Sequence, residues 1–299
     1  MKILSFISLL FFVLVSCSPV RNGDSTRPTV AVSIAPQQYL LERIVGDSMN
    51  IITLLPPDAD PENYEPTIKT LRELSGCAVY FAVGNMPFEQ VMLRRSGVEN
   101  NGKTEIISAI GLQDITNTHC HDSEHHHHND AADPHVWTSV RNCAVMARQM
   151  MEAVVKIDSA NAEYYHNRYE LLKQELDSLQ GVFASRLGSC AGDMIIVEHP
   201  SLSYFARDYG INQLYFGAEN KEVTPNRLRS VIDSARTHRQ AVTMVSEANY
   251  NADRTRSIAN QSNAECAEIN TLSLDFLQQL DKLSIVLAKS HNAYSQSAK

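Results

Sequence analysis

The sequence has no basic cluster, few aromatic residues and only one long apolar run. Its 26 Lys and Arg residues are outnumbered by 34 Asp and Glu residues, and the formal net charge is -8. Proteins that bind nucleic acid carry basic patches that neutralise phosphates, so nucleic acid is not an expected partner. With 43% hydrophobic and 20% charged residues over 299 positions, the composition excludes wholesale disorder and predicts one large or two smaller globular domains.

The long apolar run lies at the N-terminus, where Ile3–Val15 follows Lys2. It is shorter than the roughly 20 residues of a membrane-spanning helix and is typical of a signal peptide. The sequence Leu-Val-Ser-Cys that ends at Cys17 resembles the lipobox of bacterial lipoproteins. We therefore expect a signal peptide over 1–16, a lipidated Cys17 and a flexible tether over 17–28. The exported chain would then be lipid-anchored to a bacterial membrane and face the periplasm or the cell exterior; an ordinary secretory peptide is the alternative.

The remaining cysteines show no CxxC spacing and are odd in number, so a disulfide framework is not expected. They are Cys77, Cys120, Cys143, Cys190 and Cys266. Burial as small apolar side chains is the expected role of most of them. Cys190 and Cys266 both fall in the second half of the chain, and pairing between them stays open.

Apolar runs alternate with helical patterns through most of the chain. Near its start, a predicted strand over Thr29–Ile34 is followed by a helix over Gln37–Val45 that ends at Gly46, a residue suited to the end of a helix. A second helix is predicted over Thr67–Ser75. Strands that alternate with helices indicate an α/β fold with parallel sheets. We assign 29–157 to an N-terminal lobe.

A long helix interrupts this alternation. From Asn161, apolar residues recur at steps of four and three as far as Leu187, which corresponds to a helix of about 40 Å at about 1.5 Å per residue. We assign 158–187 to this linker helix and 188–299 to a C-terminal β/α lobe. Two such lobes form a cleft in which a ligand binds. A coiled-coil dimer is the alternative use of the apolar seam, and a monomer is expected.

Six of the 11 histidines lie in one short tract without apolar residues, within the predicted loop 117–130. They are His119, His121, His125, His126, His127 and His128. Imidazoles at this density are ligands for soft and borderline transition metals. We therefore expect an accessory metal-capturing loop; an expression tag is the alternative, although the tract is internal and mixed with acidic residues.

Just beyond this loop the chain reads Asp-Pro-His-Val-Trp, with His135 at its centre and the only tryptophan at its end. This motif resembles the second metal-ligand motif of the solute-binding proteins of zinc and manganese ABC transporters, the ZnuA/TroA-like family. The segment Pro-Glu-Asn-Tyr-Glu-Pro resembles the first motif, with Glu62 where the family usually has histidine. A strand that ends in Glu-His-Pro resembles the third and makes His199 the implied third ligand.

The fourth ligand that the resemblance implies is an aspartate near the end of the chain. Asn270 occupies its place, so the amide oxygen of Asn270, the carboxylate of Asp275 or a water molecule is left as the fourth ligand. Glu222 and Glu247 match acidic positions of the family that we assign to supporting roles.

The resemblance implies two Rossmann-like β/α lobes joined by the linker helix, with the metal in the cleft between them. It also implies capture of a divalent metal and its delivery to a membrane ABC permease with its ATPase, without enzyme activity. Zn²⁺ is favoured by the histidine-rich loop, because hard Mn²⁺ gains little from imidazole clusters; Mn²⁺ is the alternative, towards which Glu62 points slightly.

Two other classes of function stay open. A site with two histidines and one glutamate is also the plan of zinc hydrolases, in which Glu198 or Glu247 would act as the general base. A surface lipoprotein that buffers metal or mediates adhesion, without a transporter, is the second.

Overall fold

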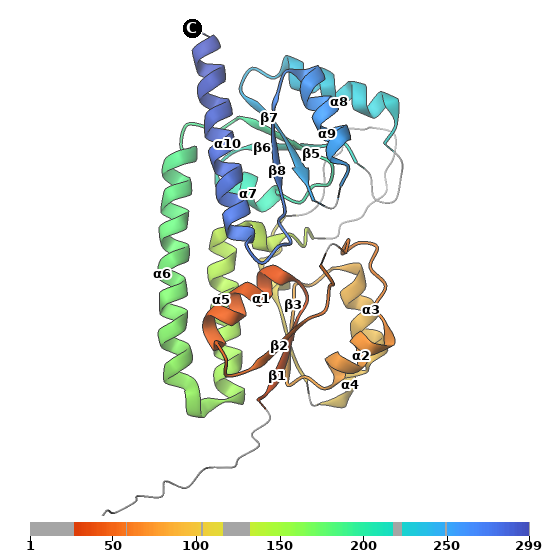
Figure 1. Ribbon diagram of the computed structural model, residues 1–299, viewed down its shortest axis with the longest axis vertical. Helices are drawn as coiled ribbons and strands as arrows, with labels where there is room; N and C mark the ends of the chain where they lie inside the picture. Colours follow the sequence, from red (N-terminus) through yellow and green to blue (C-terminus); the bar gives the residue numbers. More distant parts are fainter. Residues whose placement is uncertain are drawn as a thin grey trace, which may run out of the picture.

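A four-stranded parallel sheet forms the centre of each lobe in the computed structural model (Figure 1). The structure describes residues 27–57, 59–102, 104–115, 132–217, 223–248 and 250–298. Cys17, the signal peptide and the histidine-rich tract lie outside the described residues. The predicted α/β fold with two lobes is confirmed.

The N-terminal sheet has the strand order β2-β1-β3-β4. Its strands are β1 (Thr29–Val32), β2 (Asn50–Thr53), β3 (Val79–Ala82) and β4 (Glu105–Ser108). Every residue of the central strand β3 is buried, as expected for a parallel sheet that helices cover on both faces. In Figure 1, α1 (Ala35–Val45) lies on one face, and α2 (Ile68–Ser75), α3 (Pro87–Ser96) and α4 (Val98–Asn101) lie on the other.

The C-terminal sheet repeats this topology, with the order β6-β5-β7-β8. Its strands are β5 (Met194–Val197), β6 (Asn212–Tyr215), β7 (Val242–Glu247) and β8 (Glu265–Ile269). Its helices are α7 (Ser203–Asp208), α8 (Pro225–Thr237), α9 (Ala252–Ser262) and α10 (Phe276–Ser297). In each sheet the chain changes direction between the first and third strands, which places a ligand-binding crevice beyond the carboxyl ends of the strands.

Local signals explain several helix ends. Thr67 caps α2 through its side-chain oxygen, which accepts from the backbone N–H of Thr70. Thr224 caps α8 in the same way, and Pro225 occupies the first position of that helix. After α1, Gly46 has a φ of 53°, a conformation that glycine adopts without strain.

Two long helices form one side of the molecule and connect the lobes. The helix α5 (Val140–Ile157) is followed by the short 3-10 turn η3 (Ser159–Asn161) and by α6 (Ala162–Leu187), which packs against α5 and α1 below and α10 above (Figure 1). The predicted apolar seam of α6 is buried at Tyr165, Tyr169, Leu172, Leu176, Phe183 and Leu187. This seam packs inside the chain and contributes to its core.

The described cysteines are free thiols, so Cys190 and Cys266 do not form the pair that the sequence left open.

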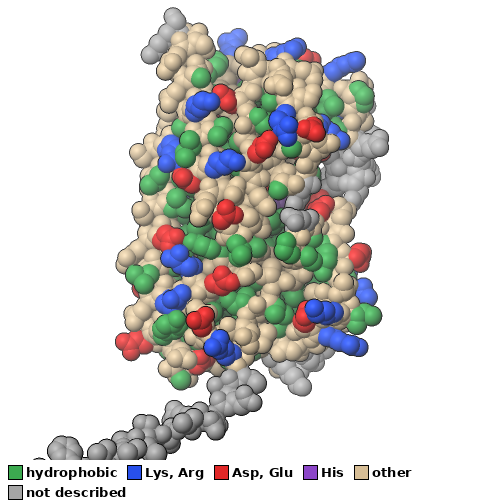
Figure 2. All heavy atoms as spheres, in the orientation of Figure 1, with side chains coloured by type: hydrophobic (Ala, Val, Ile, Leu, Met, Phe, Trp, Pro, Cys, Tyr) green, Lys and Arg blue, Asp and Glu red, His purple; other side chains and the backbone are tan. Residues whose placement is uncertain are grey.

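Among the described residues, no helix combines the length and apolarity that crossing a membrane requires. On the face shown in Figure 2, acidic and basic side chains are interspersed over both lobes, and no patch of one charge stands out.

Candidate metal site

A small polar cavity lies between the lobes, at the carboxyl ends of the strands. Its walls are Pro61, Glu62, His135, Trp137, His199, Ser201, Glu247, Ala248, Tyr250, Asn270, Thr271 and Leu272. Glu62 comes from the loop after β2, and His135 directly precedes the 3-10 turn η2 (Val136–Thr138). His199 follows β5, Glu247 ends β7 and Asn270 follows β8, so three adjacent strands of the C-terminal sheet deliver one wall.

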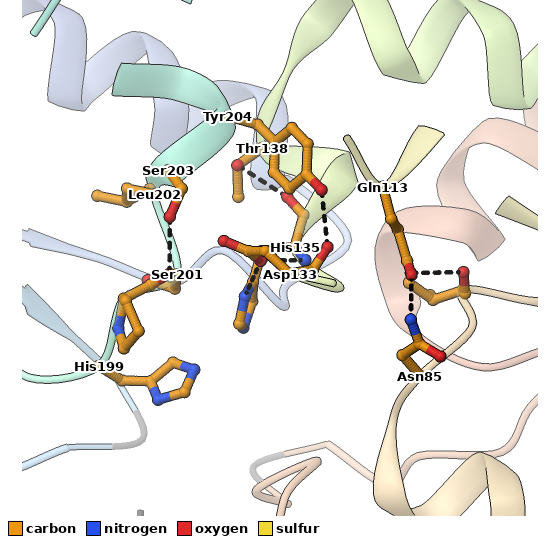
Figure 3. Close-up of polar contacts among 12 residues, drawn as sticks. Asn85, Gln113, Asp133, His135, Thr138, His199, Ser201, Leu202, Ser203 and Tyr204 are labelled. Atoms are coloured by element: carbon orange, nitrogen blue, oxygen red, sulfur yellow. Dashed lines mark hydrogen bonds and ion pairs between the residues drawn. The ribbon is translucent and has the colours of Figure 1, made fainter. Parts of the chain in front are cut away.

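The ring of His135 is held by the buried carboxylate of Asp133. Oδ1 of Asp133 lies 2.8 Å from Nδ1 of His135 and also accepts from its backbone N–H at 2.8 Å. Tyr204 in the other lobe donates its hydroxyl to the carbonyl oxygen of Asp133 at 2.7 Å (Figure 3). Because Nδ1 is engaged by Asp133, Nε2 is the ring nitrogen left to bind a metal.

His199 faces His135 across the cavity, with ring centroids 4.9 Å apart. Its other side stacks on Tyr250, whose ring is nearly parallel at 5.9 Å. Nε2 of His199 lies 3.1 Å from Oε1 of Glu62, yet this buried nitrogen makes no hydrogen bond to any described residue. This geometry allows the nitrogen and the carboxylate oxygen to bind the same cation.

The two histidines differ in their affinity for protons. Burial and the neighbouring His135 lower the pKa of His199 to about 3, so its imidazole is neutral at physiological pH and keeps a lone pair for a metal. Burial would also lower the pKa of His135, but the charge and hydrogen bond of Asp133 outweigh burial and raise it. A proton therefore competes with a metal at His135 rather than at His199.

Glu247 is a buried residue in the wall of the cavity. Its Oε1 accepts the hydroxyl of Thr271 at 2.8 Å, and its Oε2 accepts the hydroxyl of Ser201. Burial raises the pKa of this carboxyl, and the two hydroxyl groups and His135 act against that increase. Glu247 therefore places a carboxyl group beside the histidines, where two hydroxyl groups hold it.

The two candidates for the fourth ligand are placed differently. Asn270 lines the cavity, and its side-chain oxygen accepts from the backbone N–H of Leu272 at 3.0 Å. Asp275 is exposed at the start of α10, accepts from the side chain of Gln279 at 2.9 Å and is not among the lining residues. Glu222 lies outside the described residues.

Sequence reasoning missed Tyr250 and did not foresee how Trp137 connects the lobes. Nε1 of Trp137 donates to the carbonyl oxygen of Thr271 at 2.9 Å, across the interface between the lobes. The position of Tyr250, three residues after the acidic end of β7, was the only signal that pointed to it. Glu198, a candidate general base, is engaged by Nη1 of Arg254 at 2.8 Å and is not among the lining residues.

Two α/β lobes with histidines and carboxylates buried between them define the class of two-lobed metal-binding proteins. Within that class, the chain belongs to the family described as zinc-uptake complex component A, periplasmic (ZnuA), which matches residues 30–288. The family resemblance stated from the motifs is therefore confirmed. Members of this family are substrate-binding proteins of ABC transporters and not enzymes.

Relatives and solved structures agree with this family. A putative metal-binding protein of Chlamydia trachomatis is 28% identical over 77% of this chain and 79% of its own length. The zinc-binding lipoprotein AdcA of Streptococcus pneumoniae is 25% identical over 74% of this chain and 45% of its own length. A crystal structure of ZnuA, 28% identical, superimposes with a TM-score of 0.76 and covers 88% of this chain and 99% of that one.

Proposed function

We propose that the protein captures a divalent transition metal, Zn²⁺ above all, in the cavity between its lobes and delivers it to an ABC permease and its ATPase. The observation that carries this proposal is the approach of His199 Nε2 to Glu62 Oε1 at 3.1 Å beside the ring of His135. The relatives include the zinc-binding lipoprotein AdcA and, at 22% identity, the manganese transporter lipoprotein PsaA, both of Streptococcus pneumoniae.

The proposed ligands are one carboxylate oxygen of Glu62 and the Nε2 atoms of His135 and His199. Two neutral imidazoles and one carboxylate are a donor set typical of four-coordinate zinc. Asn270 is the nearest protein donor for the fourth position, and water is the alternative. Asp275, exposed and bonded to Gln279, would have to move to contribute. Mn²⁺ is the second candidate cargo, because the carboxylate of Glu62 suits a harder cation better than histidine does.

Metal binding would connect the two lobes directly. Glu62 and His135 come from the N-terminal lobe, whereas His199 comes from the C-terminal lobe. Contacts across the interface, including the hydrogen bond from Trp137 to Thr271, hold the lobes together. Together with α6, they would keep closure small, and the permease would sense a small change in lobe arrangement. A large domain rotation between metal-free and zinc-loaded protein in solution scattering would contradict this rigid-linker mechanism.

We also propose that the chain is an exported, monomeric lipoprotein anchored through Cys17, with the histidine-rich tract as an accessory metal loop. Export by a lipobox predicts that labelled fatty acid is incorporated into the protein and that Cys17→Ala abolishes this incorporation. Labelling that survives the substitution would exclude Cys17 as the anchor.

Calorimetric titration with Zn²⁺ and separately with Mn²⁺ tests the cargo site. We expect one tight zinc site that survives deletion of residues 119–128 and disappears in the His135→Ala/His199→Ala double variant. His166→Ala removes an exposed histidine of α6 and is the matched control, which should bind zinc normally. If tight binding instead vanishes with the loop and ignores the double variant, the protein is a metal buffer and the transport proposal is wrong.

A further inference from the structure

Three potential metal ligands meet at the opposite edge of the C-terminal sheet. Cys190 lies in the turn after α6, Asp193 directly precedes β5, and His291 lies on α10. One ligand atom from each of these side chains lies within 4.8 Å of the other two. Nδ1 of His291 is 3.0 Å from Oδ2 and 3.2 Å from Oδ1 of Asp193.

The turn that carries two of these residues is tightly constrained. The backbone N–H of Asp193 donates to the carbonyl oxygen of Cys190 at 3.0 Å, and that of Gly192 donates to the carbonyl oxygen of Gly210 at 2.8 Å. Gly192 has a φ of +89°, and a Cβ atom there would lie 2.2 Å from Oε1 of Gln240. The turn therefore requires glycine, and it brings the thiol and the carboxylate to the same side.

We propose that Cys190, Asp193 and His291 form a second site for a zinc-like divalent metal, separate from the cargo site. A thiolate, an imidazole and a carboxylate are all zinc ligands, with bonds of about 2.3, 2.0 and 2.1 Å respectively. Tetrahedral coordination with these bonds places the ligand atoms about 3.3–3.7 Å apart. The observed cluster, within 4.8 Å, reaches these spacings through shifts of about 1 Å or less, in which Nδ1 of His291 and Oδ2 of Asp193, now 3.0 Å apart, separate slightly.

The three side chains are buried to different extents, which leaves one side of the cluster open to solvent. Cys190 is fully buried and Asp193 is 2% exposed, whereas the side chain of His291 is 19% exposed. Solvent therefore reaches the cluster from the side of His291, where a water molecule would complete the coordination. Because the ligands come from the turn after α6, the start of β5 and α10, the metal would fasten the linker helix to the C-terminal lobe.

The strand β5 separates this cluster from the cargo site. Asp193 precedes the strand and His199 follows it, and six residues of extended chain span about 20 Å. Among the described residues that line the cavity between the lobes there is no cysteine, so sulfur ligation distinguishes the two sites.

Metal binding at this cluster replaces the thiol proton. Burial and the charge of Asp193 raise the pKa of Cys190 to about 11, so without metal the thiol keeps its proton at neutral pH. On binding, the S–H bond breaks, a sulfur–metal bond forms and the proton leaves to solvent, with no change of oxidation state.

Cobalt(II) is a spectroscopic probe that reports this sulfur directly. We would titrate the chain from residue 17 onward, carrying Cys17→Ser and Cys120→Ser so that neither cysteine contributes. A sulfur-to-cobalt charge-transfer band is expected at saturating cobalt. It should be lost in Cys190→Ser and retained in Cys266→Ser, a control cysteine of the same lobe, and in the His135→Ala/His199→Ala double variant.

A second variant separates loss of a ligand from loss of the fold. Asp193→Asn keeps the thiol and removes the charge, and it should shift the cobalt titration of the band to about 10-fold or more higher concentration. Circular dichroism checks that every variant is folded, and zinc binding at the cargo site checks this further for the variants that keep His135 and His199. Absence of the band at saturating cobalt, or a band that persists in folded Cys190→Ser, would overturn the proposal.

Discussion

Nε2 of His199 lies 3.1 Å from Oε1 of Glu62, and the two residues belong to opposite lobes. Burial lowers the pKa of His199 to about 3, so its imidazole is neutral near pH 7, and its Nε2 makes no hydrogen bond to a described residue. We therefore propose that the two side chains are ligands of one cation. The departure of Glu62 from the histidine that is usual in the family therefore bears on which cation is taken.

Glu62→His tests whether glutamate at this position affects which metal is bound. The substitution replaces an oxygen donor with an imidazole and removes one negative charge, so zinc should be retained while manganese, which gains little from imidazole, is weakened. We expect the ratio of zinc to manganese affinity to rise on the order of tenfold, or about 1.4 kcal/mol. Competition calorimetry with both metals measures it; an unchanged ratio would remove Glu62 from the ligand set.

Asp133→Asn tests whether Asp133 orients the imidazole ring of His135. Asp133 fixes the tautomer of His135 through its 2.8 Å contact with Nδ1, and loss of such a partner weakens metal binding by about 10–100-fold. Asp114→Asn, at an exposed carboxylate paired with Arg207, is the control and should leave zinc affinity unchanged. Equal zinc affinity of Asp133→Asn and the control would show that the carboxylate does not orient a ligand.

The elements of this fold were predictable because their signals are local. Apolar runs indicated the strands, Thr67 marked the start of a helix, and the seam that ends at Leu187 indicated the linker helix. The motifs also indicated that His135 and His199 share one site, and both residues line the same cavity.

The rest depends on contacts between residues distant in sequence. Asn270 and Asp275 are five positions apart, yet only Asn270 lines the cavity, because the intervening turn carries Asp275 to the exposed N-cap position of α10. The cluster at Cys190 needs His291, which lies about 100 residues further along the chain, and no spacing rule connects them.

Trp137→Phe should loosen the interface between the lobes. It removes the indole N–H that donates to Thr271 and leaves that carbonyl oxygen buried without its partner, at a cost of about 1–3 kcal/mol in the free energy of unfolding. Urea denaturation followed by circular dichroism measures the loss, and solution scattering should show a wider range of lobe separations. An unaltered midpoint and scattering profile would mean that the other contacts across the interface suffice.

The junction between α5 and α6 should become less stable in acid. Tyr165→Phe tests whether the hydrogen bond from Tyr165 to Asp158 is the cause. The hydroxyl of Tyr165 donates to Oδ2 of Asp158 at 2.6 Å, and hydrogen bonds from Asn161 and then Tyr165 lower the pKa of Asp158 below its model-compound value of 3.8. A carboxyl whose pKa is lower in the folded state stabilises the fold above its unfolded pKa, and this contribution is lost as the pH falls through the folded value.

We therefore expect Tyr165→Phe to cost about 1 kcal/mol at pH 7, where the acceptor is charged, and clearly less near pH 3. Denaturant unfolding at the two pH values measures the difference. Tyr164→Phe, at the exposed neighbouring position, should cost little at either pH. A Tyr165→Phe penalty that stays constant between the two pH values would mean that it arises from packing, and the charge on Asp158 would then contribute nothing to the junction.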